Sequence, residues 1–269
     1  MLTARSVFRE IIGDDKTFQL FASIAAVGEA QGGWENAEIA SRLPDSLRQL
    51  KPKVIRHGQD EDKHGRIFVG LLRNRGLSPC PVPDDVNYTA LLERRGIGIG
   101  HQALRRAALL EERDVVVYLA HSRVTEQRAS EQMATLRKYF GADPRLGRAL
   151  SVISADEDNH LAYSNEELLN LVGGSLGPSI REELVSCAHA EIDVYRDVSL
   201  AFVRRVGALL HWSRAKRAML MLGVHVLHRY ERSWGWRRMV KLTPAVATAR
   251  LVPTPEGDMT SARADSRPG

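Results

Sequence analysis

The chain has 269 residues, of which 43% are hydrophobic and 26% are charged, so it can bury a large core and is not a disordered polymer. Its two cysteines, Cys80 and Cys187, share no motif, which excludes a disulfide framework and a cysteine-based zinc site and favours a reducing, cytoplasmic setting. The formal net charge of +5 is too small an excess to indicate nucleic-acid binding by itself.

Neither the N-terminal stretch nor the longest apolar run indicates a membrane segment. The N-terminal stretch MLTARSVFREIIGDDK has no long apolar core and no small-residue cleavage site, so we expect no signal peptide. The longest apolar run, AMLMLGVHVL at 218–227, is too short to cross a bilayer, so we expect no transmembrane segment.

Apolar residues recur three and four positions apart over long segments, which indicates amphipathic helices, and strand signals are scarce. The spacing predicts a first helix over about 16–42 and a second over about 45–75, followed by a long crossover rich in proline and glycine. Four more helices are expected over about 101–140, 144–172, 179–210 and 212–238. We therefore predict an all-α domain over 1–242 and a flexible tail over 243–269.

Capping signals refine two of these helices. Asp143 and Pro144 have the residue types of an N-cap and a first helical position. Ser164 and Glu167 have capping-box spacing, which predicts a break in the fourth helix near Tyr163.

One acidic string with a terminal histidine occurs twice, as DEDKH at 60–64 and DEDNH at 156–160. Residues three apart share one face of a helix, so each string projects a glutamate and a histidine together. These pairs are Glu61 with His64 and Glu157 with His160, and no other glutamate in the sequence has a histidine three positions later. Both pairs fall within the apolar seam of their helix, where solvated charges are not expected.

The other two helices of the repeat each place one carboxylate in their seam. In an antiparallel hairpin, residues equally far from the turn lie at the same height. Glu29 and Glu61 lie equally far from residue 45, and Glu126 and Glu157 lie equally far from the turn over 141–144. Other glutamates fit the seam or the midpoint less well: Glu35, Glu38 and Glu131.

Four carboxylates and two imidazoles would thus meet in a bundle core, where unpaired charges are costly. Two multivalent cations remove that cost. Glutamate and histidine ligands without a thiolate suit iron or manganese better than structural zinc.

This arrangement resembles the ligand set of the ferritin-like di-iron carboxylate oxygenases and oxidases, in which two helices give a Glu and two give Glu-x-x-His. The resemblance covers 16–172, includes the long crossover, and implies a four-helix bundle, here with two additional C-terminal helices. It implies six metal ligands: Glu29, Glu61, His64, Glu126, Glu157 and His160. It also implies that Asp60 and Asp156 hydrogen-bond to ligand histidines.

Four further residues are candidates for an extra ligand or a pocket position. His57 lies one turn before Glu61, with a hydrogen-bonded core histidine as the alternative. Tyr118 lies two turns before Glu126, with packing as the alternative. Nothing in the spacing of His189 and Glu191 requires either role.

The resemblance implies a pair of iron ions, with manganese as the alternative metal, that use O₂ as co-substrate and receive electrons from a ferredoxin or reductase. We expect an oxygenase or oxidase acting on a small organic or carrier-bound substrate by hydroxylation, desaturation, N-oxygenation or oxidative cleavage. Iron handling, a tRNA hydroxylase-like activity with RNA as partner, and a metal-free interaction bundle remain alternatives. We also expect a homodimer. The basic stretch RYERSWGWRRMVK favours contact with phosphate, a membrane surface or an acidic redox partner, or is only a cationic helix end.

Overall fold

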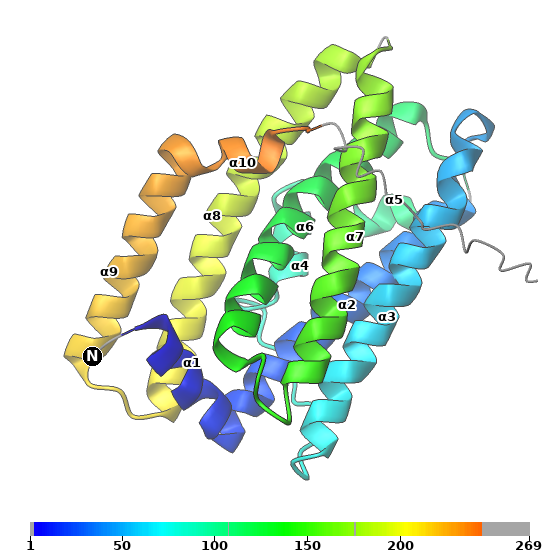
Figure 1. Cartoon of the computed structure of the whole chain (residues 1–269). Helices are drawn as coiled ribbons and strands as arrows, with labels where there is room; N and C mark the ends of the chain where they lie inside the picture. The colour runs from blue at the N-terminus through cyan, green and yellow to red at the C-terminus, as the bar shows by residue number, and fades with distance from the viewer. Residues whose placement is uncertain (1–2, 107, 175, 244–269) are drawn as a thin grey trace, which may run out of the picture.

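The computed structural model describes residues 3–106, 108–174 and 176–243. They form an all-α, ferritin-like four-helix bundle with two more long helices on its C-terminal side (Figure 1). The bundle helices are α2 (Asp15–Ser41), α3 (Lys51–Arg73), α6 (Glu112–Phe140) and α7 (Gly147–Val172). No strand occurs within the described ranges, and none of their helices is both long and apolar enough to cross a bilayer.

Helices α2 and α3 form the first hairpin and approach closely at two glycines. A Cβ atom added to Gly58 would lie 3.1 Å from the carbonyl oxygen of Gly33 and 3.0 Å from Cβ of Asn36. Both positions therefore require glycine for the two backbones to pack at this distance. A 3₁₀ turn, η1 (Asp45–Leu50), joins the two helices.

Helices α6 and α7 form the second hairpin. The Asp143 carboxylate accepts hydrogen bonds from the backbone of Arg145 at 2.8 Å and of Leu146 at 3.1 Å, so the predicted turn precedes α7. The predicted N-cap is wrong, because Asp143 caps a turn over 144–146 and α7 begins only at Gly147, with Leu146 at its N-cap position. The predicted break near Tyr163 is wrong. Ser164 lies inside α7, where its hydroxyl donates to the carbonyl oxygen of Leu161 at 3.1 Å instead of capping a new helix.

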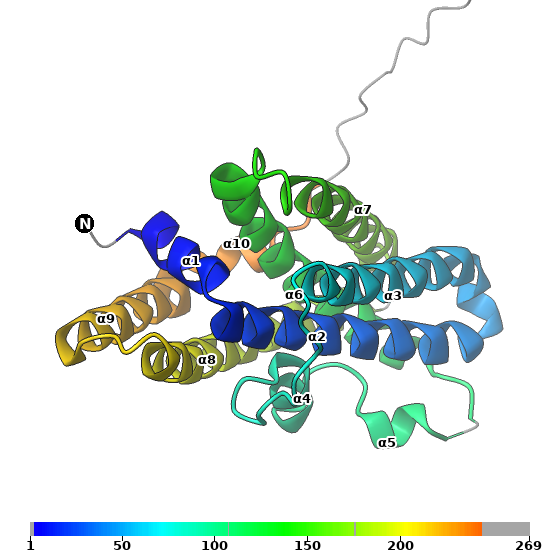
Figure 2. The same cartoon turned by 90° about the horizontal axis from the view of Figure 1, so that it is seen from below.

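The crossover contains α4 (Tyr88–Arg94) and α5 (His101–Leu104), which lie on the side of α2 away from α7 (Figure 2). Helix α6 begins at Glu112, not near residue 101 as the apolar spacing predicts. The side chain of Arg42 donates to the carbonyl oxygens of Ala103 at 3.2 Å and Arg106 at 2.6 Å, and these bonds hold this segment at the end of α2. A short N-terminal helix, α1 (Ala4–Gly13), was not predicted.

The C-terminal part contains α8 (Gly177–Leu209), α9 (Arg214–Tyr230), a π-helical turn η2 (Glu231–Gly235) and α10 (Arg237–Val240). The prediction of one helix over 212–238 is therefore wrong at its end, where the π turn interrupts it. Helix α8 packs against α6, and α9 packs against α8 at the edge of the molecule (Figure 1). Of the predicted tail over 243–269, only Thr243 lies within the described residues.

The apolar core of the bundle is divided into two parts. One cluster includes Val54, Leu119 and Leu168, and the other includes Phe68 and Ile153. Buried polar residues occupy the layer between these clusters, at the level of the two repeated acidic strings. This polar layer is the candidate functional site.

Candidate metal centre

The structure brings together all six residues of the predicted ligand set, with helices α2 and α6 each giving one glutamate. Two groups of side chains could each hold a metal ion, because their ligand atoms lie within 4.8 Å of one another. The first group is Glu29, Glu61, His64 and Glu157, and the second is His57, Glu61, Glu126 and His160. Glu61 belongs to both groups, so the two candidate positions are adjacent.

The two motif histidines direct the same ring nitrogen inward. Nδ1 of His64 lies 3.2 Å from a Glu29 oxygen and 3.4 Å from Oε1 of Glu157. Nδ1 of His160 lies 3.6 Å from Oε1 of Glu61 and 3.9 Å from Oε2 of Glu157. The two oxygens of Glu157 therefore face different histidines.

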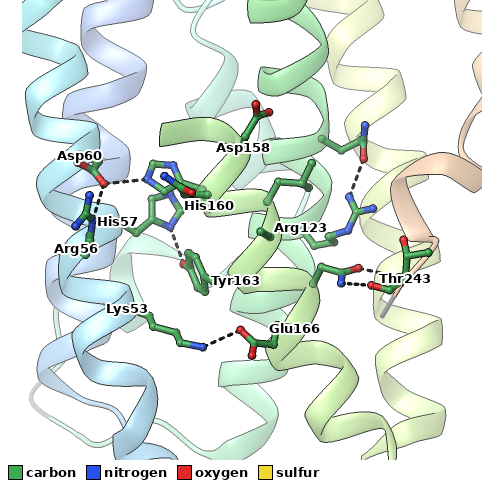
Figure 3. Close-up of a pocket in the computed structure, with 15 residues that line it drawn as sticks. Lys53, Arg56, His57, Asp60, Arg123, Asp158, His160, Tyr163, Glu166 and Thr243 are labelled. Carbon is green, nitrogen blue, oxygen red and sulfur yellow. Dashed lines mark hydrogen bonds and ion pairs between the residues drawn. The ribbon is translucent and has the colours of Figure 1, made fainter. Parts of the chain in front are cut away.

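The outward ring nitrogens face the aspartates that precede the motif glutamates, each from the opposite hairpin. Nε2 of His64 shares a hydrogen bond of 3.0 Å with Asp156. Nε2 of His160 lies 3.5 Å from Asp60 (Figure 3). Lys63 lies between the two aspartates, at 2.6 Å from Asp60 and 2.7 Å from Asp156. This outer layer orients the imidazoles and compensates the charge of the two aspartates.

His57 reaches the second group from one turn earlier on α3. Its Nε2 lies 3.1 Å from both Glu61 and Glu126, and its ring stacks on that of His160 with centroids 3.9 Å apart. Its Nδ1 shares a hydrogen bond of 2.7 Å with the hydroxyl of Tyr163. The structure places His57 among the candidate ligands and also hydrogen-bonds it to Tyr163, so its geometry fits both an extra ligand and a hydrogen-bonded core histidine.

A chain of hydroxyl groups determines which nitrogen of His57 carries the proton in the neutral ring. Tyr118 donates to the side-chain oxygen of Asn36 at 2.7 Å, and its hydroxyl lies 2.7 Å from that of Tyr163. Since Tyr118 has one proton, Tyr163 must donate to Tyr118, and Nδ1 of His57 must donate to Tyr163. The lone pair of Nε2 then faces two carboxylates, an arrangement that requires either a cation or a second proton.

Several buried atoms of the layer lack hydrogen bonds within the described structure. They are Oε2 of Glu126 and both ring nitrogens of His160. Buried polar atoms are nearly always satisfied, so unsatisfied ones need an explanation. These carboxylate and imidazole atoms are buried, lack hydrogen bonds and point at one another. Such atoms are the ligands that a hard or borderline metal ion prefers.

Burial and mutual repulsion shift the pKa values of these carboxyl groups. Burial, followed by the charge of Glu61, raises the pKa of Glu29 to about 8. Burial and the neighbouring Glu126 raise the pKa of Glu157 well above its usual value. Burial alone would also raise the pKa of Glu126, but the imidazoles of His160 and His57 outweigh it and hold that pKa well below its usual value.

The pKa values of His64 and His57 are both raised, which is opposite to the effect of burial. Burial lowers the pKa of His64, but Glu29 and Asp156 outweigh it and raise the value to about 8. Burial likewise opposes a charged His57, whereas Tyr163 and the nearby carboxylates raise its pKa well above the usual value. Positive charge, from protons or from metal ions, therefore stabilises this layer of buried carboxylates.

Three other candidates from the sequence lie outside both groups. Glu191 is fully buried and forms an ion pair with Arg128 at 2.8 Å, and it accepts a hydrogen bond from Tyr88 at 2.8 Å. His189 lies beside Trp236, with ring centroids 5.1 Å apart. Tyr118, the third, is buried and contacts the site through Tyr163.

Sequence reasoning missed Lys63 and Tyr163. Each lies three positions after a residue already singled out, Asp60 or His160, so helical spacing was a signal for both. That signal is weak alone, because lysine and tyrosine are common on helix faces. Their roles follow from the packing of α3 against α7, which the sequence does not state.

A cavity of about 670 Å³ adjoins the layer (Figure 3). Its lining comes from α3, α6, α7 and Thr243, and it includes His57 and His160 of the second group. Most of the other lining residues are polar or charged, among them Lys53, Arg56 and Arg123. None of the described residues that line it belongs to α8 or α9.

The sequence matches no family model and no curated protein. Among solved structures, it is similar to a Synechococcus protein with aldehyde deformylating oxidase activity. The TM-score is 0.51 at 18% identity, and the match covers 83% of this chain and 94% of that one. This similarity shows that the two chains share a fold.

Proposed function

We propose that this chain is a non-haem di-iron enzyme that uses O₂ to oxidise an organic substrate. The observation that carries the proposal is the pair of adjacent ligand groups that share Glu61 in a buried layer between two apolar clusters. The oxidase activity of the Synechococcus protein of similar fold is consistent with such a reaction. Hydroxylation, desaturation, N-oxygenation and oxidative cleavage all belong to this class.

Glu29 and His64 hold the first ion in this proposal, and Glu126 and His160 hold the second. Glu61, which belongs to both groups, and Glu157, whose two oxygens face His64 and His160, would be shared between the two ions. His57 adds a third nitrogen, on the second ion alone, because its Nε2 faces Glu61 and Glu126 at 3.1 Å. The free lone pairs and the absence of a thiolate from both groups suit iron, or manganese, better than structural zinc.

An iron pair held by these residues would supply electrons for the reduction of O₂, and an external donor such as a ferredoxin or reductase would restore them. The protein residues provide the geometry. Asp156 and Lys63 keep the ring of His64 oriented, and Tyr163 does the same for His57. In this proposal the cavity beside His57 and His160 holds the substrate next to the second position.

Metal analysis of the purified full chain tests this proposal. After anaerobic addition of Fe(II), we expect two irons per chain and a new optical band when O₂ is admitted. Glu61→Ala and Glu157→Ala should lose both the second iron and the band. Asp158→Asn is the matched control, because it removes a neighbouring charge on the exposed side of α7 and should keep both.

Three results would contradict parts of the proposal. Fewer than two bound irons in the wild-type chain would remove the metal centre itself. Iron oxidation by a hollow multi-subunit shell, with no organic substrate consumed, would assign the centre to iron handling. Unchanged iron content and spectrum in His57→Gln would remove His57 from the ligand set and leave the other six residues.

A further inference from the structure

Helix α9 presents a row of large apolar side chains to solvent. Met219, Leu222, Val226 and Tyr230 follow one another at intervals of three and four, so they share one face. They are 57%, 63%, 62% and 60% exposed, and no residue of α9 is buried. A helix of a globular protein usually covers its apolar face, so this row needs an occupant.

A row of basic side chains runs beside the apolar row. The exposed residues Arg214, His225, Arg229 and Arg232 lie at intervals that keep them on one flank of the helix. Within 211–243 the sequence contains one acidic residue, Glu231, which is 2% exposed and paired with Arg128 and Arg238. The exposed face of α9 is therefore apolar and cationic, with no exposed acidic side chain.

The shape of this face limits what it can contact. Helix α9 lies at the edge of the molecule, beyond α8, in both views (Figure 1, Figure 2), and the side chains of the row are exposed. A convex face of this kind fits a flat surface without rearrangement. A second copy related by a two-fold axis that pairs the two α9 helices antiparallel would place the arginines of both copies on the same side, where they repel.

An anionic bilayer matches both chemical features of the face. Leucine, valine and methionine side chains can enter the boundary between headgroups and acyl chains, while arginines remain among anionic headgroups. Trp234, which is 68% exposed, and Tyr230 extend the row with amphipathic rings that prefer this boundary. The side chain of Arg237 lies over the Trp234 ring at 4.9 Å and places a further charge at that end.

We propose that the outer face of α9 binds peripherally to an anionic lipid surface, with the helix axis parallel to the membrane. This proposal does not depend on the metal centre, because no residue of the face belongs to either ligand group.

Vesicle sedimentation with the full-length chain tests the proposal. We expect binding to vesicles of mixed phosphatidylcholine and phosphatidylglycerol, little binding to phosphatidylcholine alone, and weaker binding as salt increases. Leu222→Ser combined with Val226→Ser should reduce the partition coefficient about tenfold or more. Arg229→Gln combined with Arg232→Gln should reduce it about tenfold on the anionic vesicles.

Ile55→Ser combined with Val172→Ser is the matched control, because both residues are exposed apolar side chains on other helices and the pair should bind as the wild type does. Unchanged circular dichroism shows that each variant folds. Failure of the wild type to bind anionic vesicles overturns the proposal. A dimer in light scattering that Leu222→Ser with Val226→Ser dissociates assigns the face to a second copy instead. Binding that is lost in Arg229→Gln with Arg232→Gln but unchanged in Leu222→Ser with Val226→Ser assigns the face to an acidic macromolecule.

Discussion

The carboxylate of Asp156 lies between two cationic groups of the facing hairpin. One of its oxygens is 3.0 Å from Nε2 of His64 and 2.7 Å from Nζ of Lys63. Burial raises the pKa of Asp156, but Lys63 and His64 outweigh it, so the pKa lies below its usual value. An ionised acceptor at this point keeps the proton of a neutral His64 on Nε2 and leaves Nδ1 for the centre of the site.

Asp156→Asn should therefore weaken iron binding without unfolding the chain. We expect a loss of about 10- to 100-fold in affinity for one of the two ions, measured by competition with a chelator. Asp60→Asn is the comparison, because Asp60 lies 3.5 Å from His160 Nε2 and that nitrogen has no hydrogen bond. The loss of iron affinity in Asp60→Asn should be smaller than in Asp156→Asn. Equal affinities in Asp156→Asn and the wild type would show that this carboxylate does not tune the ligand.

The convergence of the six candidate ligands could be predicted because helical spacing and hairpin symmetry are properties of the sequence. Glu61 and His64 must share a face, and Glu29 must lie level with Glu61. Which ring nitrogen points inward depends on side-chain rotamers. The placement of His57 depends on a hydroxyl from α7, and no spacing rule connects two helices of different hairpins.

At the scale of elements, the closeness of α2 and α3 depends on Gly58. A methyl group there would meet the Gly33 carbonyl at 3.1 Å and Asn36 Cβ at 3.0 Å, both tighter than ordinary contacts. Neither contact is the end of a flexible side chain, so the two helices would have to separate. Separation would also displace Glu61, whose carboxylate lies against Gly32 on the facing helix.

Gly58→Ala should destabilise the protein although alanine favours helix. Overpacking costs about 1–3 kcal/mol, and the gain in helix propensity is about 1 kcal/mol. Gly70→Ala is the control in the same helix, because nothing lies within 4 Å of its added Cβ and only the gain remains. Urea unfolding in the presence of a chelator should separate the two variants by about 2 kcal/mol. Equal midpoints would show that the helices adjust without cost.

The six long helices were predictable from apolar periodicity, whereas the short helices α1 and α4 and the limits of two long helices were not. The interval between α5 and α6 is held by Arg42, whose side chain takes carbonyl groups that a continuous helix would use. The π turn after α9 contains Glu231, whose carboxylate pairs with Arg128 of α6. In both places a tertiary hydrogen bond overrides a local preference, and its partner is far away in the sequence.

At the scale of the whole molecule, one buried ion network attaches the C-terminal helices to the bundle. Arg128 of α6 donates to Glu191 of α8 and to Glu231 of η2, each at 2.8 Å. Arg238 of α10 donates to Glu231 at 2.5 Å and to Glu131 of α6 at 2.7 Å. The network places α8 and α10 against the outer side of α6 and so supports the helix that carries Glu126.

Glu231→Gln should destabilise the protein near neutral pH. Burial raises the pKa of Glu231, but Arg128 and Arg238 outweigh it and lower the pKa below its usual 4.5. Removing one partner of a buried pair costs about 3–5 kcal/mol, and the lower end applies because Glu191 still pairs with Arg128.

The pH dependence of that loss follows from the direction of the pKa shift. A carboxyl group with a lowered pKa contributes its full stability above its usual value of 4.5 and loses it as the pH falls through the lower value of the folded state. The difference in unfolding free energy between Glu231→Gln and the wild type should therefore be constant from about pH 6 to pH 8 and shrink below about pH 4.5. Glu182→Gln, on the exposed side of α8, should stay within about 0.5 kcal/mol of the wild type. A difference that persists unchanged in acid would mean that the packing of the side chain, not its charge, attaches the C-terminal helices.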